Sequence, residues 1–300
     1  MKFNFSYLRW YFIFSWFFLS VYSCAALTPR SSNSLTLMTW NIQNLFNDQL
    51  EGGEYAEFIP SPQWTTGDFY ARCAQVARHV QLAGTPDLLV LQELENFQTA
   101  QILQSLFLAD LGYLYWYTED SPGVQCVVLS RHPLLQTSYL QPEGDEMVTQ
   151  RPILEVLVNW EGRNVRIFAN HWKSQREGSS TQKYRSKSNQ LLNYRLKNLE
   201  DEEIFLVGDF NCDPTELQFP HEFLDAWKSL EDHGTYWFRD AWQKLDQIHY
   251  KSQAAYLESW VFRGGDLADS RGRPKAWAAR SKKGLSDHFP LLMRLEFLRE

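Results

Sequence analysis

The sequence is poor in cysteine and carries no excess of basic charge. Four cysteines in 300 residues, without a Cys-x-x-Cys pair, provide neither a disulfide framework nor a zinc site. Lys and Arg number 29 against 36 Asp and Glu, a net charge of −7. This balance argues against stable binding of nucleic acid through a broadly basic surface. An enzyme that contacts a polyanion briefly is still compatible with it.

Repeats, low-complexity tracts and internal linkers are also missing from the sequence, which excludes a solenoid and favours one domain. With 44% hydrophobic and 22% charged residues, the chain has the composition of a globular protein that can bury a full core. We therefore expect a single domain over residues 34–300, preceded by a short polar tether at residues 27–33.

The N-terminus resembles a secretory signal peptide over residues 1–26. Lys2 and Arg9 precede an uncharged run at residues 10–22, and small residues follow it. The run of 13 residues is short for a bilayer span, which takes about 20, although the aromatic residues before Arg9 keep an uncleaved anchor open. We expect an exported protein, either periplasmic or extracellular.

The segment VYSC (21–24) resembles a bacterial lipobox in which Cys24 would carry the lipid, although Tyr22 departs from the usual residue. Two alternatives stay open: a membrane-anchored lipoprotein attached through Cys24, and ordinary cleavage near Ala25 or Ala26. Without residues 1–26 the chain has 27 basic and 36 acidic residues, a net charge of −9. An odd number of cysteines then remains, which allows at most one disulfide: Cys73, Cys126 and Cys212.

Apolar runs and helical periodicity alternate along the rest of the chain. Runs typical of strands occupy residues 35–40, 88–91, 124–129, 153–158, 165–169, 204–207 and 291–297. Apolar residues at helical spacing occupy residues 68–83, 99–111 and 181–199. This alternation predicts an α/β fold with layered sheets.

Polar side chains stand where several of the predicted strands end. These residues are Asn41, Glu93, His171, Asp209 and Asn211, with Asp287 and His288 just before the last strand. In open α/β sheets, ligands bind outside the carboxyl ends of the strands, so we expect these side chains to line one cleft. A carboxylate at Glu93, with oxygen ligands from Asn41 and Asp287, suits Mg²⁺ or Mn²⁺. Such a site favours phosphate chemistry.

Each of these residues taken alone also has a structural explanation. Asn41 and Asp209 can satisfy their own turns, Glu93 can cap the following helix, and His171 can be a hydrogen-bonded structural histidine. Their joint placement at successive strand ends favours the functional interpretation over several independent coincidences.

Five short motifs resemble those of the endonuclease/exonuclease/phosphatase superfamily, the fold of pancreatic-type deoxyribonuclease. In chain order they are TWNIQNLF (39–46), LQELEN (91–96), NHWKS (170–174), GDFN (208–211) and SDHFP (286–290). The match extends over residues 36–297. It implies a four-layer α/β sandwich, with two mixed β-sheets face to face and helices outside, and metal-dependent hydrolysis of a phosphate ester.

The resemblance also implies roles for the metal-binding and water-activating residues. Glu93 would bind Mg²⁺, with Mn²⁺ as an alternative, helped by Asn41 and Asp287 directly or through water. Asp209 would orient or deprotonate the attacking water, and Asn211 would hold a phosphate oxygen.

The two histidines would contact the phosphate. His171 and His288 would donate hydrogen bonds to it, and Asp246 would hold His288 in the required tautomer. The segment around Asp246, WQKLDQI (242–248), matches less well, because the polar HYK (249–251) follows where an apolar strand is usual. Lys173 and Arg151 are candidate substrate contacts, although an ion pair inside the fold explains Arg151 equally well.

Two basic stretches flank the predicted histidines. Residues 171–197 contain seven Lys and Arg against one Glu, and residues 263–283 contain seven against two Asp. Either stretch alone is typical of a solvated surface, but two beside one cleft favour a nucleic acid substrate, DNA or RNA. We therefore expect a monomeric nuclease.

Three alternatives keep the fold and change the function. They are a phospholipid diesterase resembling the bacterial sphingomyelinases, a phosphomonoesterase, and a surface-binding lipoprotein without catalysis. A lipid-active enzyme needs an exposed apolar hairpin beside the cleft, and residues 256–262 are the candidate for one.

Overall fold

The computed structural model describes residues 33–121, 123–145 and 149–297. The predicted signal peptide, the lipobox with Cys24 and nearly all of the tether lie outside these ranges. The described residues from Asn33 onward group as one compact unit. Among the described residues, no helix is both long and apolar enough to cross a membrane.

The first sheet has six strands in the order β13-β14-β1-β2-β4-β3. Their bounds are β1 (Ser34–Leu45), β2 (Leu88–Leu94), β3 (Tyr115–Tyr117), β4 (Gln125–Ser130), β13 (Ala255–Val261) and β14 (Leu291–Glu296). The central pair β1 and β2 is parallel, and every other pair is antiparallel.

The second sheet repeats this plan with the order β5-β6-β7-β8-β12-β9. Its strands are β5 (Leu134–Leu140), β6 (Ile153–Trp160), β7 (Arg163–His171), β8 (Glu203–Asp209), β9 (Leu224–Asp225) and β12 (Asp246–Lys251). Again one pair, β7 and β8, is parallel and the others are antiparallel. A separate hairpin joins β10 (Tyr236–Phe238) to β11 (Ala241–Gln243).

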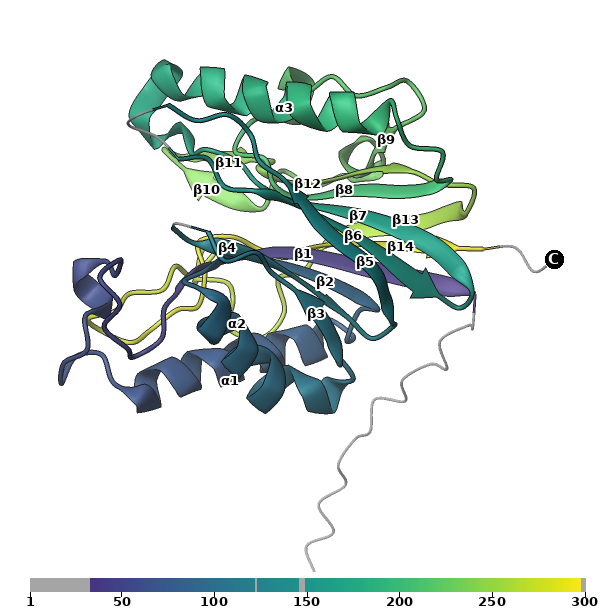
Figure 1. The fold of residues 1–300 in the computed structure, drawn as a ribbon. Helices are drawn as coiled ribbons and strands as arrows, with labels where there is room; N and C mark the ends of the chain where they lie inside the picture. The colour runs from purple at the N-terminus through teal and green to yellow at the C-terminus, as the bar shows by residue number, and fades with distance from the viewer. Residues whose placement is uncertain (1–32, 122, 146–148, 298–300) are drawn as a thin grey trace, which may run out of the picture. The chain divides into compact units, whose positions relative to one another are not determined.

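Helices cover the outer faces of both sheets. α1 (Thr66–Leu82) and α2 (Phe97–Leu103) lie on the outer side of the first sheet, and α3 (Gln182–Leu196) lies on the outer side of the second (Figure 1). The predicted four-layer α/β sandwich, with two mixed sheets face to face, is therefore confirmed. The predicted helix at residues 99–111 divides, because α2 ends at Leu103 and one π turn and one 3-10 turn follow it.

Strand periodicity places neighbouring side chains in different layers of the core. In β7 Ile167 packs between the sheets, and the next residue, Phe168, packs under α3. In β8 Phe205 and Leu206 divide in the same way. Successive side chains of a strand point to opposite faces, so a strand covered on both sides reads as a continuous apolar run.

Two segments depart from what their sequence indicates. The polar continuation at residues 249–251 is part of the buried strand β12, where the His249 ring Nε2 is hydrogen-bonded to Gln247 Oε1 at 2.7 Å. The candidate apolar hairpin at residues 256–262 is largely strand β13, which pairs along its length with β14. It belongs to a different sheet from β12, so these two strands form no hairpin.

Candidate active site

The four strands of the two parallel pairs carry four of the predicted site residues near their carboxyl ends, which are Asn41, Glu93, His171 and Asp209. In the first sheet Asn41 of β1 stands opposite Gln92 of β2, directly before Glu93. In the second sheet His171 and Asp209, the last residues of β7 and β8, stand opposite each other. Parallel strands end at the same edge of a sheet, so each pair contributes two adjacent polar side chains.

Asn41 connects the two sheets. Its buried side-chain Nδ2 donates hydrogen bonds to Glu93 Oε1 at 3.0 Å and to Asp209 Oδ2 at 3.1 Å. Its Oδ1 accepts a hydrogen bond from the Gln43 backbone N–H at 3.0 Å. Asn41 thus stabilises a turn and also links carboxylates from different sheets.

Glu93 sits in a strained backbone position at the end of β2. Its φ of 69° lies in the left-handed region, and the pairing of β2 with both neighbouring strands shifts register beside it. Its Oε2 accepts a hydrogen bond from the Asn44 N–H at 2.9 Å. Left-handed backbone at non-glycine residues clusters at functional sites, and here Gln43, Asn44 and Asn211 share it.

His171 is buried between the two carboxylates. Its Nε2 lies 3.7 Å from Glu93 Oε1 and 3.9 Å from Asp209 Oδ2. Burial lowers the pKa of His171 well below its usual value, and the positive charges of Arg151 and His288 lower it further. His171 is therefore a neutral imidazole at pH 7 that can act as a hydrogen-bond donor or acceptor.

Asp209 is the buried carboxylate of the second sheet. Burial raises its pKa; the charge of His288 opposes this rise, the charge of Asp246 adds to it, and the pKa is about 7. Its Oδ1 accepts a hydrogen bond from the Asn211 N–H at 2.9 Å. The Asn211 side chain donates to the Trp172 carbonyl at 3.0 Å, which fixes the turn after β8.

His288 and Asp246 form a buried pair. The His288 Nδ1 lies 2.7 Å from Asp246 Oδ2, which also accepts a hydrogen bond from Thr235 Oγ1. Burial lowers the pKa of His288, but the charge and hydrogen bond of Asp246 outweigh this effect and raise the pKa to about 10. His288 is thus an imidazolium at pH 7, with its tautomer and orientation set by Asp246.

Asp287 lies at the rim beside two residues that the sequence did not single out individually as site residues. Its Oδ2 is 3.8 Å from a guanidinium nitrogen of the exposed Arg176. Arg176 is close enough to Tyr236 for its charge to act on the Tyr236 hydroxyl, and the Tyr236 ring lies 4.6 Å from the His288 ring between centroids. Tyr236 carries no local signal, because it reaches the site only through the β10-β11 hairpin.

The predicted substrate contacts Arg151 and Lys173 lie next to the histidine strand. Arg151 donates a hydrogen bond to the Trp172 carbonyl at 3.4 Å, and its charge acts on His171. Lys173 is half-buried and follows Trp172 directly. Both residues are therefore near the end of β7, and their predicted contact with substrate stays a prediction.

The donor set suits a hard cation that keeps most of its water ligands. No three carboxylate, imidazole or thiolate groups within the described ranges come close enough to enclose a metal ion. Burial raises the pKa of Asp287, and the negative charge of the nearby Glu93 raises it further. Mg²⁺ is commonly held by one or two carboxylates and several waters, so these residues fit it. Asn41 turns its amide nitrogen toward the carboxylates, and in this arrangement it supports Glu93 rather than offering an oxygen ligand.

Comparisons with known proteins agree with this architecture. The model of the endonuclease/exonuclease/phosphatase family matches residues 38–288. The chain belongs to this family. The resemblance carried by its five motifs is thereby confirmed. A search of curated proteins found no significant match.

Solved structures with low sequence identity to this chain share its fold. A humanized D. rerio TDP2 with 14 mutations is 18% identical, with a TM-score of 0.63 over 89% of this chain and 100% of that chain. D. rerio TDP2 complexed with single-strand DNA product is 18% identical, with a TM-score of 0.61 over 88% and 99%. The human nocturnin catalytic domain with bound sulfate is 17% identical, with a TM-score of 0.57 over 90% and 95%.

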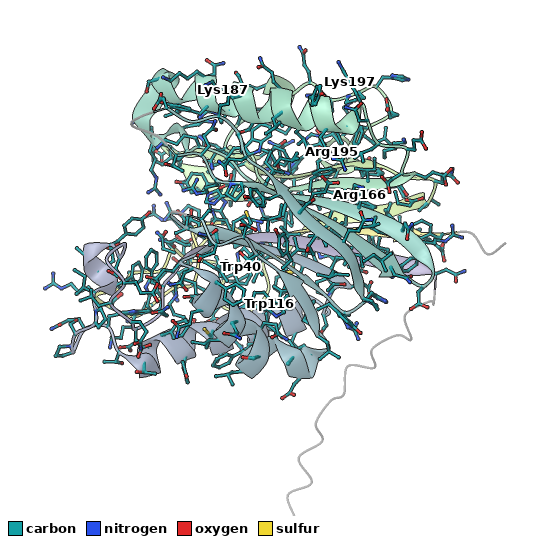
Figure 2. All side chains as sticks on the ribbon, in the orientation of Figure 1. Trp40, Trp116, Arg166, Lys187, Arg195 and Lys197 are labelled. Atoms are coloured by element: carbon teal, nitrogen blue, oxygen red, sulfur yellow. The ribbon has the colours of Figure 1, made fainter. Side chains whose placement is uncertain are left out.

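Many Lys and Arg side chains in the two basic stretches, residues 171–197 and 263–283, form ion pairs with acidic side chains. Arg195 pairs with Glu155, and Lys282 pairs with Asp68 at 2.7 Å. Figure 2 shows Lys187 on α3 and Lys197 directly after its last residue, on the outer side of the second sheet. The stretches therefore bring less free positive charge to the site than their composition indicates.

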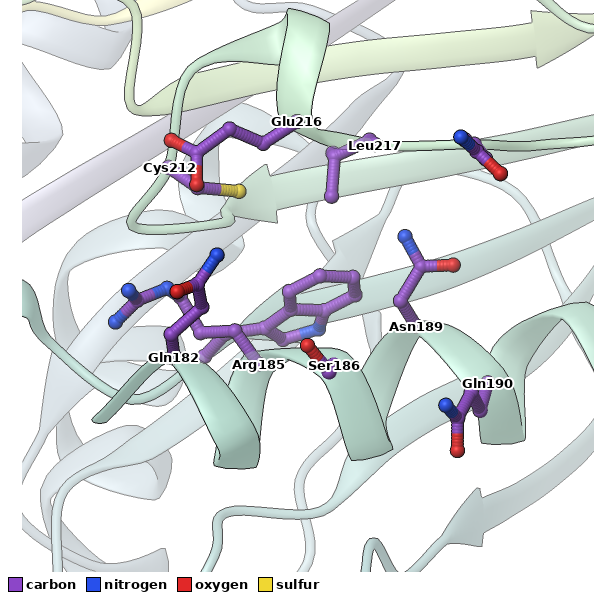
Figure 3. Close-up of a pocket in the computed structure, with 10 residues that line it drawn as sticks. Gln182, Arg185, Ser186, Asn189, Gln190, Cys212, Glu216 and Leu217 are labelled. Carbon is purple, nitrogen blue, oxygen red and sulfur yellow. The ribbon is translucent and has the colours of Figure 1, made fainter. Parts of the chain in front are cut away.

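A polar pocket of about 230 Å³ lies between α3 and the loop that follows β8. In Figure 3, Gln182, Arg185, Ser186 and Asn189 project from the helix, and Cys212 and Leu217 lie on the opposite side. The pocket includes none of the predicted site residues.

Cys73, Cys126 and Cys212 are all buried free thiols, so none of the three forms a disulfide.

Proposed function

We propose that this protein is a metal-dependent phosphodiesterase that hydrolyses phosphodiester bonds of nucleic acid. The observation that carries the proposal is the hydrogen-bond bridge from Asn41 to both Glu93 and Asp209. It brings together two carboxylates from different sheets: Glu93, which would bind a cation, and Asp209, which would act on the attacking water.

The residues divide the reaction between them. Glu93, with Asp287, would hold Mg²⁺ or Mn²⁺, which when bound neutralises charge on the scissile phosphate. Asp209, with a pKa of about 7, is suited to take a proton from the water that attacks phosphorus. Asn211 would hold a phosphate oxygen through its amide.

The two histidines then act on the phosphate with different charges. Neutral His171 can donate one hydrogen bond to a phosphate oxygen. His288, kept as an imidazolium by Asp246, adds a positive charge that stabilises the developing negative charge. As the bond between phosphorus and the leaving oxygen breaks, that oxygen takes a proton from the His288 imidazolium, because neutral His171 has no acidic proton to give. Water supplies the new oxygen on phosphorus, and its proton goes to Asp209.

An aromatic row beside the site supports nucleic acid as the substrate. The Tyr236 ring lies 6.1 Å from the Phe238 ring at an angle of 21°, and Phe238 is 42% exposed. The Arg239 guanidinium lies 5.1 Å from the Phe238 ring centroid. Exposed aromatic rings stack on nucleobases with little sequence preference. Lys173 and Arg151, near the end of β7, would add phosphate contacts.

The two relatives with bound ligands are consistent with this proposal. One TDP2 structure holds a single-strand DNA product, and the nocturnin structure holds a sulfate anion. A phospholipid substrate has less support, because residues 255–261 form a paired edge strand rather than a projecting apolar hairpin.

We further propose a monomer that is exported, either cleaved near Ala25 or lipidated at Cys24. Replacing Cys24 with Ser and following membrane partition of the expressed protein distinguishes these two fates.

The test is hydrolysis by the expressed full chain of supercoiled plasmid, single-stranded DNA, RNA, sphingomyelin vesicles and p-nitrophenyl phosphate, with Mg²⁺ or Mn²⁺. Chelator and Glu93→Gln should each reduce cleavage at least about 100-fold, because loss of a metal ligand should cost no less than loss of a group that only orients a ligand. Glu95→Gln is the matched control. It removes a carboxylate two residues further on, which accepts its hydrogen bonds from Asn47 and Thr99, and it should cleave normally.

Two results would redirect the proposal. Hydrolysis of sphingomyelin or of the monoester with no cleavage of any nucleic acid would keep the chemistry and change the substrate class. Inactivity on every substrate, together with no metal binding, would favour a surface-binding protein that retains the fold.

A further inference from the structure

Arg72, on α1, is fully buried beneath the end of β1. Its guanidinium donates hydrogen bonds to four backbone carbonyls: Asn44 at 2.6 Å, Gln43 at 2.7 Å, Ile42 at 3.0 Å and Leu285 at 3.3 Å. The Trp277 ring covers the group at 4.6 Å from its centroid. A planar guanidinium has five N–H groups and can serve all four carbonyls, whereas an ammonium group has only three N–H groups.

The carbonyls belong to two segments that are far apart in the sequence. Ile42, Gln43 and Asn44 form the irregular end of β1, where Gln43 and Asn44 both have a φ of 51°. Leu285 is more than 200 residues further on, two positions before Asp287. Sparsely populated backbone conformations persist only when surrounding groups fix them, and Arg72 supplies such a constraint.

Each segment also carries or supports a residue of the proposed metal site. The Asn44 N–H donates to Glu93 Oε2, while the Asn44 carbonyl accepts from Arg72. On the other segment, Ser286 Oγ donates to the Asn41 carbonyl at 2.6 Å and accepts from the His288 N–H. Arg72 therefore holds the backbone of Asn44, which contacts Glu93. It also holds Leu285, whose neighbour Ser286 contacts Asn41 and His288.

The charge of Arg72 has no direct ion-pair partner. Within the described ranges no carboxylate lies at ion-pair distance from its guanidinium. Burial lowers its pKa to about 9, against the opposing effects of Cys73, Glu93 and Asp287, so it stays protonated at pH 7. Burying an unpaired charge is costly, and its four carbonyl contacts together with the nearby site carboxylates offset that cost.

We propose that Arg72 is a positioning residue, which holds the end of β1 and the segment before Asp287 in the geometry that binds the metal ion. The inference rests on the proposed metal-dependent function. It assigns Arg72 an effect on metal affinity and turnover, acting through Glu93 and Asp287, beyond its effect on stability.

The experiment compares Arg72→Lys and Arg72→Met with wild type and with Arg166→Met, using the expressed full chain. Arg166 is the matched control, because it is also buried but forms ion pairs, on strand β7 of the second sheet, with Glu155 of β6 and with Asp201, which precedes β8. Mn²⁺ binding is measured by calorimetry without substrate, and hydrolysis of bis(p-nitrophenyl) phosphate gives kcat and KM. We expect both Arg72 variants to weaken Mn²⁺ binding at least about tenfold and to lower kcat similarly. KM should change less than about twofold, because this residue does not contact substrate.

The outcomes separate the inference from the function on which it rests. If wild type neither binds Mn²⁺ nor hydrolyses the diester, the proposed function fails. If wild type does both and a folded Arg72→Lys binds Mn²⁺ as wild type does, the positioning role is rejected. It is also rejected if Arg166→Met weakens binding to the same degree, or if both Arg72 variants fail to fold while Arg166→Met folds, because the role would then be structural alone.

Discussion

At the residue scale, the polar side chains of the site each serve two kinds of partner. Asp209 uses Oδ1 for the N–H of its own turn and Oδ2 for Asn41 of the other sheet. Asn41 divides its amide in the same way. The turn explanation and the functional explanation that the sequence leaves open are therefore compatible, because a carboxylate and an amide each have two polar atoms.

The His288–Asp246 pair predicts a pH-dependent stability. The folded-state pKa of His288, about 10, is above its unfolded value of about 6.5. Its contribution to stability is thus fully present below pH 6.5 and is lost as the pH rises through 10. Asp246→Asn should lower the free energy of unfolding by about 3 kcal/mol at pH 7 and by much less at pH 10.

Denaturant unfolding at both pH values measures this difference. Thr235→Val is the control, since it removes the other hydrogen bond to Asp246 Oδ2 without a titrating group and should destabilise equally at each pH. An Asp246→Asn effect that is the same at pH 7 and pH 10 would contradict an imidazolium at His288.

At the scale of elements, the parallel pair β7 and β8 depends on one glycine. Gly208 precedes Asp209 at a φ of 140°, and a Cβ atom there would lie 1.9 Å from the Asn170 carbonyl oxygen. The two strands can therefore place His171 opposite Asp209 only if this position has no side chain.

Gly208→Ala should lower the free energy of unfolding by about 3 kcal/mol or more, because backbone rather than a flexible side chain must move. Gly162→Ala is the matched comparison. That glycine has a φ of 87° in the turn between β6 and β7 with open space around it, and its replacement should cost about 1 kcal/mol. Denaturant unfolding checks both variants, and equal costs would show that the close approach to Asn170 can be relieved.

At the scale of the whole molecule, the site lies where two separately paired sheets meet. The larger hydrophobic cluster contains side chains of both sheets, among them Trp40 from β1 and Phe205 from β8. A cation bound at the strand ends should consequently stabilise the entire unit rather than one sheet.

Saturating Mg²⁺ at about 100 times its Kd should add about 2.7 kcal/mol, which is about 5–8 °C in Tm for a domain of this size. Circular dichroism and tryptophan fluorescence, each recorded during heating with Mg²⁺ or with chelator, should show the same increase in Tm. Glu93→Gln should show none. A wild-type protein whose Tm is unchanged by Mg²⁺ and Mn²⁺ would contradict the metal site.

The amino-acid pattern predicted the seven strands with apolar runs, which are β1, β2, β4, β6, β7, β8 and β14, together with the family and most of the polar residues at the strand ends. It could do so because apolar runs reflect burial and parallel strands end at a common edge. The tertiary structure alone decided which atoms meet, such as Asn41 and Asp209, which are 168 residues apart. It also decided the places of Arg72 and Tyr236 and the acidic partners of the basic stretches, because contacts made by packing two sheets together leave no local pattern in the chain.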